Sequence, residues 1–371
     1  MSLLDKPRLL DKLRAFHGYV RKNNGHIGTK QRGIDLNFNN ACNLRCEYCF
    51  TNSPKGDHVK DELPIDLVAS IADQADELGI FEFDLQGGEL LLRPEKLFQV
   101  LEAIKPERFY LYLTTNGYFL DADMARRLAE AKVSRVSVSV DSFDEETHDR
   151  IRGRKESWKR AMAALKHVQE AGLDPYLNIT VGHYNALSED LEMLCQYSED
   201  QKYTTLLNVA VPSGMWLKLD KMAEVVVDET DKARLIELRK KHKNMLRNLW
   251  NPFDKEFERI LGCNTVNRLY ITPLGDVLVC PYVHIKIGNV YQQSLKEISE
   301  FGFSIKHFRE HSDLCLAGEN TEFITKFMSF PGQSIFHPAD ARQIFPAEDF
   351  VGGVPAATEP KSGRRLRMLN T

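Results

Sequence analysis

The sequence has neither a long apolar run nor a long basic block. No uninterrupted apolar stretch in the 371 residues is long enough to span a bilayer, and residues 1–7 lack the apolar core of a signal peptide. The formal net charge is -4, which gives no indication of a nucleic-acid-binding surface. Seven cysteines, an odd number in a chain without a secretory leader, argue against a disulfide framework. We therefore expect a cytoplasmic protein that binds neither nucleic acid nor membrane.

Three of these cysteines fall within eight residues, spaced Cys-x3-Cys-x2-Cys at Cys42, Cys46 and Cys49. Thiolates select soft metal centres such as zinc or an iron–sulfur cluster. A four-iron cluster normally takes four cysteine ligands, and the sequence places no fourth cysteine nearby, so one iron would be left open. An open metal position is typical of catalytic sites. The run therefore predicts an enzyme.

A zinc site is the competing interpretation. Cys42, Cys46 and Cys49 would form a structural Cys3His set together with His58. Zinc sites of this kind generally use two paired groups of ligands, whereas only one side is paired here. A zinc site also gives no reason for the glycine-rich turn that follows the next predicted strand. We therefore favour the iron–sulfur interpretation.

Strand-like and helix-like segments alternate regularly after residue 33. The predicted strands are 34–38, 81–85, 109–114, 135–140, 176–181 and 205–211, and the predicted helices are 6–22, 65–78, 96–105, 121–132, 157–171 and 187–197. Six strand–helix units in series require a parallel sheet with right-handed crossovers. We expect an α/β fold, a partial (β/α)6 TIM-like barrel, with its site at the C-terminal ends of the strands. The cysteine run directly follows the first strand.

Polar turns gather at the same predicted edge. They contain Gly87, Gly88 and Glu89 after the second strand, Asn116 after the third, Ser139 and Asp141 after the fourth, and Asn178 in the fifth. Each turn alone is common, since Asn-Gly and Gly-Gly often only permit a tight bend. Their shared position beside the cysteines is what indicates a site.

The cysteine run, with the aromatic Tyr48 before its last cysteine, resembles the signature of the radical S-adenosylmethionine (SAM) superfamily over about residues 33–215. The resemblance implies that the three thiolates hold a [4Fe-4S] cluster whose open iron is chelated by SAM. It implies that Gly87, Gly88 and Glu89 bind the methionine amino group. It places Tyr48, Asn116, Ser139, Asp141 and Asn178 at the cofactor, and lets Arg150 or Arg152 pair with the SAM carboxylate.

A second group of cysteines lies around a predicted hairpin with its turn at Pro273–Asp276: Cys263 precedes it, Cys280 ends it and Cys315 follows it. The spacing of Cys263, Gly275, Cys280 and Cys315 is similar to the SPASM or twitch domain, a small α+β extension that binds an auxiliary iron–sulfur cluster. The resemblance makes the three cysteines its ligands and implies one auxiliary [4Fe-4S] cluster. The fourth ligand stays open between His284, His311, Asp313 and none, and Cys195 is interpreted as a buried core thiol. One of the three cysteines is alternatively a hydrogen-atom donor.

The expected domains are a helical extension (1–32), the radical SAM barrel (33–225), a helical connector (226–258), the twitch-like domain (259–330) and an irregular tail (331–371). The family resemblance implies reductive cleavage of SAM to a 5′-deoxyadenosyl radical, which abstracts a hydrogen atom from a substrate carbon. The electron would come from an external donor such as flavodoxin or ferredoxin.

Only about thirty residues precede the first predicted strand, too few for a separate leader-binding domain. We therefore favour an oxidoreductase that oxidises or epimerises a small carbohydrate-like or aminocyclitol-like metabolite. A peptide-modifying maturase and a non-catalytic zinc protein are the alternatives.

Overall fold

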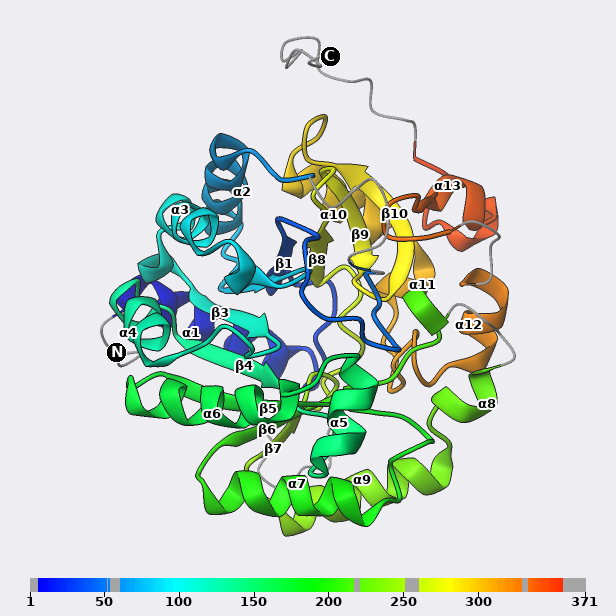
Figure 1. Ribbon diagram of the computed structural model, residues 1–371. Helices are drawn as coiled ribbons and strands as arrows, with labels where there is room; N and C mark the ends of the chain where they lie inside the picture. Colours follow the sequence, from blue (N-terminus) through cyan, green and yellow to red (C-terminus); the bar gives the residue numbers. More distant parts are fainter. Residues whose placement is uncertain are drawn as a thin grey trace, which may run out of the picture.

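A single continuous sheet organises the chain. The computed structural model describes residues 6–51, 53, 61–216, 221–250, 260–328 and 333–355. Within these ranges eleven strands pair in the order β11-β10-β9-β8-β1-β2-β3-β4-β5-β6-β7 (Figure 1). His58 of the zinc interpretation lies outside the described residues.

The first six strands are parallel neighbours in sequence order, as the six-unit barrel requires. They are β1 (Gly33–Asn37), β2 (Glu82–Gln86), β3 (Tyr110–Thr115), β4 (Arg135–Ser139), β5 (Asp174–Val181) and β6 (Thr204–Val209). The helices between them lie on the outside of the sheet (Figure 1): α2 (Ile65–Glu77), α3 (Pro94–Ile104), α4 (Ala122–Glu130), α5 (Glu145–Arg152), α6 (Ser157–Glu170) and α7 (Glu189–Asp200). The α/β fold with a parallel barrel-like sheet is confirmed.

The residues of these strands alternate between two environments. Apolar side chains such as Leu36, Leu85 and Val138 are fully buried in the main hydrophobic core, whose other members come from the covering helices. The alternate positions carry polar side chains, among them Asp35 and Asp84. Because successive strand residues point to opposite faces, one face of the sheet packs on helices and the other presents polar groups to the barrel interior.

Capping residues stand at the ends of several helices. The carboxylate of Asp121 accepts a hydrogen bond from the Met124 N–H at 2.8 Å and begins α4. Gly79 and Gly172 both have a φ of +73°, the left-handed conformation that follows the ends of α2 and α6. α1 (Pro7–Lys22) matches the predicted N-terminal helix and contributes Leu9, Phe16 and Val20 to a separate apolar cluster.

Where the structure describes it, the predicted helical connector (226–258) is only partly helical. After α8 (Met222–Val225), α9 (Glu229–Lys241) ends before β7 (Met245–Arg247), which pairs with β6 as a further parallel strand. Charge and propensity predict the helix, whereas the short strand depends on the free edge of β6. The break expected at residues 251–252 lies outside the described residues.

The C-terminal region extends the same sheet. β8 (Arg268–Ile271) pairs in parallel with β1, and β9 (Asp276–Cys280) returns antiparallel to β8, so the predicted hairpin is present. β10 (Val283–Asn289) adds a further antiparallel strand, and β11 (Ala339–Asp340) ends this edge. The remaining elements are α10 (Leu295–Gly302), α11 (Lys306–Arg309), α12 (Thr321–Phe327) and α13 (Ala341–Ile344). Short 3-10 turns occur at Leu90–Leu92, Pro106–Arg108, Gly214–Trp216 and Ala347–Asp349.

The segment predicted as an irregular tail therefore contains regular structure between residues 333 and 355. No helix in the described part of the chain is long and apolar enough to cross a bilayer.

Candidate active site

One cavity of about 280 Å³ opens at the C-terminal ends of the barrel strands. All six cysteines of the two predicted sets line it: Cys42, Cys46, Cys49, Cys263, Cys280 and Cys315. The pairing of β8 with β1 brings the two sets together, although more than 200 residues separate them in sequence.

The first cysteine set lies in a loop fixed by backbone hydrogen bonds. The N–H groups of Arg45 and Glu47 donate to the carbonyls of Arg152 and Ile151 at 3.1 and 3.0 Å. Burial, with a smaller contribution from the neighbouring thiols, raises the pKa of Cys42 to about 12. Three thiols close enough to affect one another's protonation, on a loop held from outside, fit a metal cluster with three protein ligands.

The glycine turn after β2 packs directly on the backbone that precedes Cys42. The N–H of Gly88 donates to the Asn39 carbonyl at 3.1 Å, and that of Glu89 to the Ala41 carbonyl at 2.6 Å. A Cβ at Gly88 would lie 2.1 Å from the Ala41 oxygen, so this close approach requires glycine. Gly87 and Gly88 both line the cavity.

Glu89 holds the ends of two strands together. Its buried carboxylate accepts hydrogen bonds from the N–H groups of Leu91 and Asn116, both at 2.9 Å, and from the Thr115 hydroxyl at 2.7 Å. Burial raises the pKa of Glu89, and the N–H donors oppose that shift. Glu89 is not among the cavity-lining residues. Its contacts in the structure are those of a support for the loop that carries Asn116.

A buried ion pair supports the other side of the cysteine loop. Arg152 Nε lies 2.6 Å from Asp141 Oδ2, and the Tyr48 hydroxyl donates to the same carboxylate. Arg152 Nη1 lies 3.9 Å from Cys46 Sγ. Burial, together with the Arg152 charge, lowers the pKa of the adjacent His148 to about 4, so this imidazole is neutral at physiological pH. Of the two predicted arginines, Arg152 lines the cavity, whereas the exposed Arg150 pairs with Glu47.

The other predicted cofactor residues are distributed as follows. Tyr48, Asn116, Ser139 and Asn178 line the cavity, whereas Asp141 lies behind Arg152 and Tyr48. Asn116 Nδ2 donates to Asn43 Oδ1 at 2.9 Å, which ties the β3 loop to the cysteine loop. The structure therefore brings the predicted residues to one mouth, some at the cavity wall and some behind it.

Cys263, Cys280 and Cys315 form the second set. A hydrogen bond from the Cys315 thiol lowers the pKa of Cys263 to about 6, whereas burial raises that of Cys280 to about 12. The Cys315 N–H donates to Glu319 Oε2 at 2.7 Å, and Glu319 pairs with Arg247 at 2.5 Å. Three thiols close enough to affect one another's protonation are again a donor set that fits an iron–sulfur cluster.

No histidine lines the cavity within the described ranges. His311 stacks on His26 and pairs with Asp313, and His284 is buried with its Nε2 unpartnered. Cys195 is fully buried on α7, in the hydrophobic core, as the sequence predicted.

The sequence did not predict the group of polar residues that forms the floor of the cavity. Arg268 on β8 pairs with Asp35 on β1 and with Glu82 on β2, and Asp84, Tyr112 and Arg135 line the cavity beside it. The available signal was the alternation of apolar and polar residues in strands that are buried on both faces. A charged residue in such a strand must point into a polar interior.

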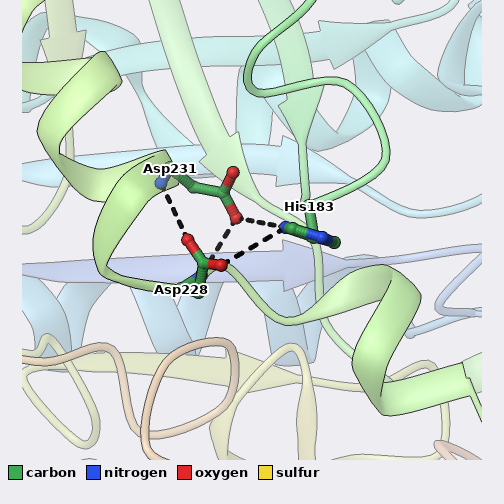
Figure 2. A group of neighbouring side chains, drawn as sticks. All are labelled: His183, Asp228 and Asp231. Carbon is green, nitrogen blue, oxygen red and sulfur yellow. Dashed lines mark hydrogen bonds and ion pairs between the residues drawn. The ribbon is translucent and has the colours of Figure 1, made fainter.

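Another group of ionisable side chains lies outside the cavity. His183 Nδ1 contacts Asp231 at 2.8 Å and Asp228 at 3.8 Å (Figure 2). Asp228 and Asp231 form a capping box at the start of α9, and the second oxygen of Asp231 is turned away from the imidazole (Figure 2). The ion pair with Asp231 raises the pKa of His183. Helix capping accounts for this arrangement.

Comparison with known proteins decides the family. The model of the radical SAM superfamily matches residues 36–197, and that of the SPASM iron–sulfur cluster-binding domain matches residues 263–317. The chain contains a radical SAM domain and a SPASM domain. These domains imply a SAM-binding [4Fe-4S] cluster and an auxiliary iron–sulfur cluster, which the two cysteine sets fit.

Two curated relatives show how far the similarity extends. This radical SAM protein is 26% identical over 310 residues to the AdoMet-dependent heme synthase of Methanosarcina barkeri, a match that covers 74% of this chain and 83% of that protein. It is 35% identical over 162 residues to a GTP 3',8-cyclase of Microcystis aeruginosa, covering 41% of this chain and 49% of the relative. The matched region thus spans about half the length of that cyclase.

Solved structures share the fold. The crystal structure of Streptococcus suis SuiB bound to precursor peptide SuiA superposes with a TM-score of 0.56 at 17% identity, covering 79% of this chain and 69% of SuiB. A structure of anSMEcpe with bound AdoMet gives 0.57 at 16% identity, covering 80% and 96%.

Proposed function

We propose that this protein is a radical SAM oxidoreductase that oxidises a small polar metabolite. The observation that carries the proposal is the single cavity lined by both cysteine sets. A substrate held there would face the SAM site at one wall and the auxiliary site at the other. The proposal assigns the barrel to residues 33–225 and the auxiliary domain to residues 259–330.

The proposed cofactor ligands follow from the cavity wall. Cys42, Cys46 and Cys49 would hold the SAM-binding cluster, and Cys263, Cys280 and Cys315 the auxiliary cluster. When bound, the first cluster and SAM supply reductive cleavage of the sulfonium and removal of a hydrogen atom from the substrate. The residues of the chain bind and orient the reactants and exclude water from the cavity.

The arrangement of side chains around SAM is also part of the proposal. Gly87 and Gly88 line the cavity beside the cysteine loop and would lie against the methionine end of SAM. Arg152, fixed by Asp141, would pair with its carboxylate. Tyr48, whose ring is tilted by 54° against that of Trp216 at 5.4 Å between centroids, would lie beside the cofactor's aromatic part.

Oxidation is favoured over epimerisation by the distribution of thiols. If all six cavity cysteines hold clusters, no free thiol remains in the cavity to return a hydrogen atom, since Cys195 is buried in the core. The substrate's second electron would then pass to the auxiliary cluster. The substrate's first electron would leave with the abstracted hydrogen atom. The separate electron needed to cleave SAM would come from an external protein such as flavodoxin or ferredoxin, in a reducing compartment.

The polar lining supports a carbohydrate-like or aminocyclitol-like substrate. Asn178, Thr180, Asn208, Arg247 and Asn248 all line the cavity. Asn208 Nδ2 donates to Asn178 Oδ1 at 2.6 Å, so the two amides present a fixed row of donors and acceptors. Such side chains suit a ligand rich in hydroxyl or amino groups.

Iron and sulfide analysis after anaerobic reconstitution tests the proposal. Wild-type protein should hold about eight irons per chain, and Cys46→Ala and Cys280→Ala about four each. Cys46→Ala should abolish reductive SAM cleavage, measured as 5′-deoxyadenosine, and Cys280→Ala should retain it. Cys195→Ala is the matched control and should keep the wild-type iron content.

Two results would contradict the assignment: colourless protein that holds only zinc, or 5′-deoxyadenosine formed by Cys46→Ala at the parental rate. Product analysis with SAM, a reductant and a panel of sugars, aminocyclitols and peptides then identifies the substrate class.

A further inference from the structure

Four arginines line the cavity, and three of them have a carboxylate partner: Arg152 with Asp141, Arg247 with Glu319, and Arg268 with Asp35 and Glu82. These pairs neutralise the guanidinium groups and fix their positions. The fourth arginine, Arg135, is different.

Within the described ranges, no carboxylate lies within 4.0 Å of the Arg135 guanidinium. Aromatic rings surround it instead, with the Tyr112 centroid at 3.6 Å, that of Tyr176 at 4.1 Å and that of Tyr110 at 5.9 Å. Cation–π contacts use the faces of the guanidinium plane and leave its N–H groups available. Arg135 Nε is buried and has no hydrogen-bond partner among the described residues. A half-buried cation whose Nε–H is buried and unpartnered is a site for an anion.

Three carboxyl groups are close enough to interact electrostatically with Arg135, those of Glu82, Asp84 and Asp174, and none of them lies within 4.0 Å of its guanidinium. Asp84 accepts a hydrogen bond from the Thr114 hydroxyl at 3.2 Å, and its nearest cation is Arg268 at 3.8 Å. Burial and the charge of Asp35 raise the pKa of Asp84 to about 8, so it is largely protonated at neutral pH. A protonated carboxyl can donate a hydrogen bond to an anion held by Arg135.

Arg135 lies at the far end of the cavity from the first cysteine set, Cys42, Cys46 and Cys49, which follows the C-terminal end of β1. It is the first residue of β4, and Ser139, at the mouth, is the last. Four residues of extended strand span about 13 Å. A ligand that reaches from the cysteines to Arg135 is therefore elongated.

We propose that Arg135 binds a carboxylate or phosphate group at the inner end of the substrate, whose reacting carbon lies at the cysteine-lined mouth. The position of the reacting carbon rests on the proposed function. The anion site rests on Arg135, its three tyrosines and the cavity. The substrate class becomes an elongated polar metabolite with one anionic end.

Calorimetric titration of the reconstituted, SAM-loaded protein tests this with three probes that share one skeleton: glucose, gluconate and glucose 6-phosphate. At least one anionic probe should bind tenfold or more tightly than glucose, and which one does so distinguishes a carboxylate site from a phosphate site. Arg135→Gln should reduce that affinity to the level of glucose. Arg135→Lys should keep part of it, because the charge remains and the planar donor fork is lost.

Arg127→Gln is the matched control. Arg127 also stacks on an aromatic ring, that of Phe98 at 4.4 Å, but does not line the cavity. Circular dichroism and 5′-deoxyadenosine formation establish that each variant is folded and loaded. The proposal is overturned if no anionic probe binds wild-type protein more tightly than glucose, or if Arg135→Gln keeps the preference. If wild-type protein prefers an anionic probe but does not cleave SAM, only the proposed function is contradicted.

Discussion

Replacement of Glu89 by alanine tests whether this residue supports the mouth of the barrel. The substitution removes the acceptor of two backbone N–H groups, those of Leu91 and Asn116, and of the Thr115 hydroxyl. A buried donor left without a partner costs about 1–3 kcal/mol. The hydroxyl can rotate to another acceptor, so the two N–H groups set the magnitude. We expect the free energy of unfolding to fall by about 2–6 kcal/mol.

Urea unfolding under anaerobic conditions, followed by far-UV circular dichroism, measures this loss through the shift of the midpoint at constant slope. Glu89→Gln should lose less, because one amide oxygen remains as an acceptor. Glu77→Ala, an exposed change on α2, should stay within about 0.5 kcal/mol of wild type. If Glu89→Ala unfolds at the same urea concentration as Glu77→Ala, the carboxylate does not support the loop and the reasoning fails.

Three further changes have defined outcomes. In thermal unfolding, the stability of Asp84→Asn relative to wild type should be about 1–3 kcal/mol greater at pH 8 than at pH 6. The raised pKa of Asp84 makes the wild-type native state hold a proton that the unfolded state has lost, so wild type loses stability as the pH rises. The raised pKa would be contradicted if the stability difference between variant and wild type were the same at both pH values. Gly214→Ala should reduce iron retention on the first cysteine set, since its Cβ would lie 2.4 Å from the Cys49 carbonyl at a φ of +60°; wild-type iron content would refute that contact. Arg268→Met should lower the free energy of unfolding by about 3–5 kcal/mol in urea titration, because it leaves Asp35 without a counterion; Arg45→Met, at an exposed position, is the control.

The sequence predicts the barrel well where the hydrophobic periodicity of a segment agrees with the turn and capping residues at its ends. Strands with period-two alternation and helices with an apolar stripe were found within a few residues of their observed bounds. α5 was missed because Glu145–Arg152 contains one apolar residue, Ile151, and has no stripe. Its local signal is the cap, since Asp144 accepts from the Thr147 N–H at 2.8 Å. A helix held by capping and by contacts with the cysteine loop leaves little trace in hydrophobic periodicity.

The candidate site was likewise predictable only where the information is local in the sequence. Cysteine spacing is local information, and it led to both thiol sets. The pairing of Arg268 with Asp35 depends on β8 lying beside β1, a contact between residues 233 positions apart in the chain. Nothing near either residue specifies that neighbour. The ion pairs of the polar floor follow only when the closing strand is known, whereas the alternation within β4 already indicates the inward position of Arg135.

The alternation inside the strands explains why this barrel holds a cavity. A barrel interior filled by branched apolar side chains is a packed core. Here the inward positions carry Asp35 and Asp84 with two arginines, and charged groups are stable in an interior only when they are paired or solvated. Arg268 meets the first condition through its carboxylates. Arg135 has no such partner in the described part of the chain, so it needs water or a ligand anion. The residue that the fold leaves unpaired thus marks the end of the cavity where the substrate's charge should lie.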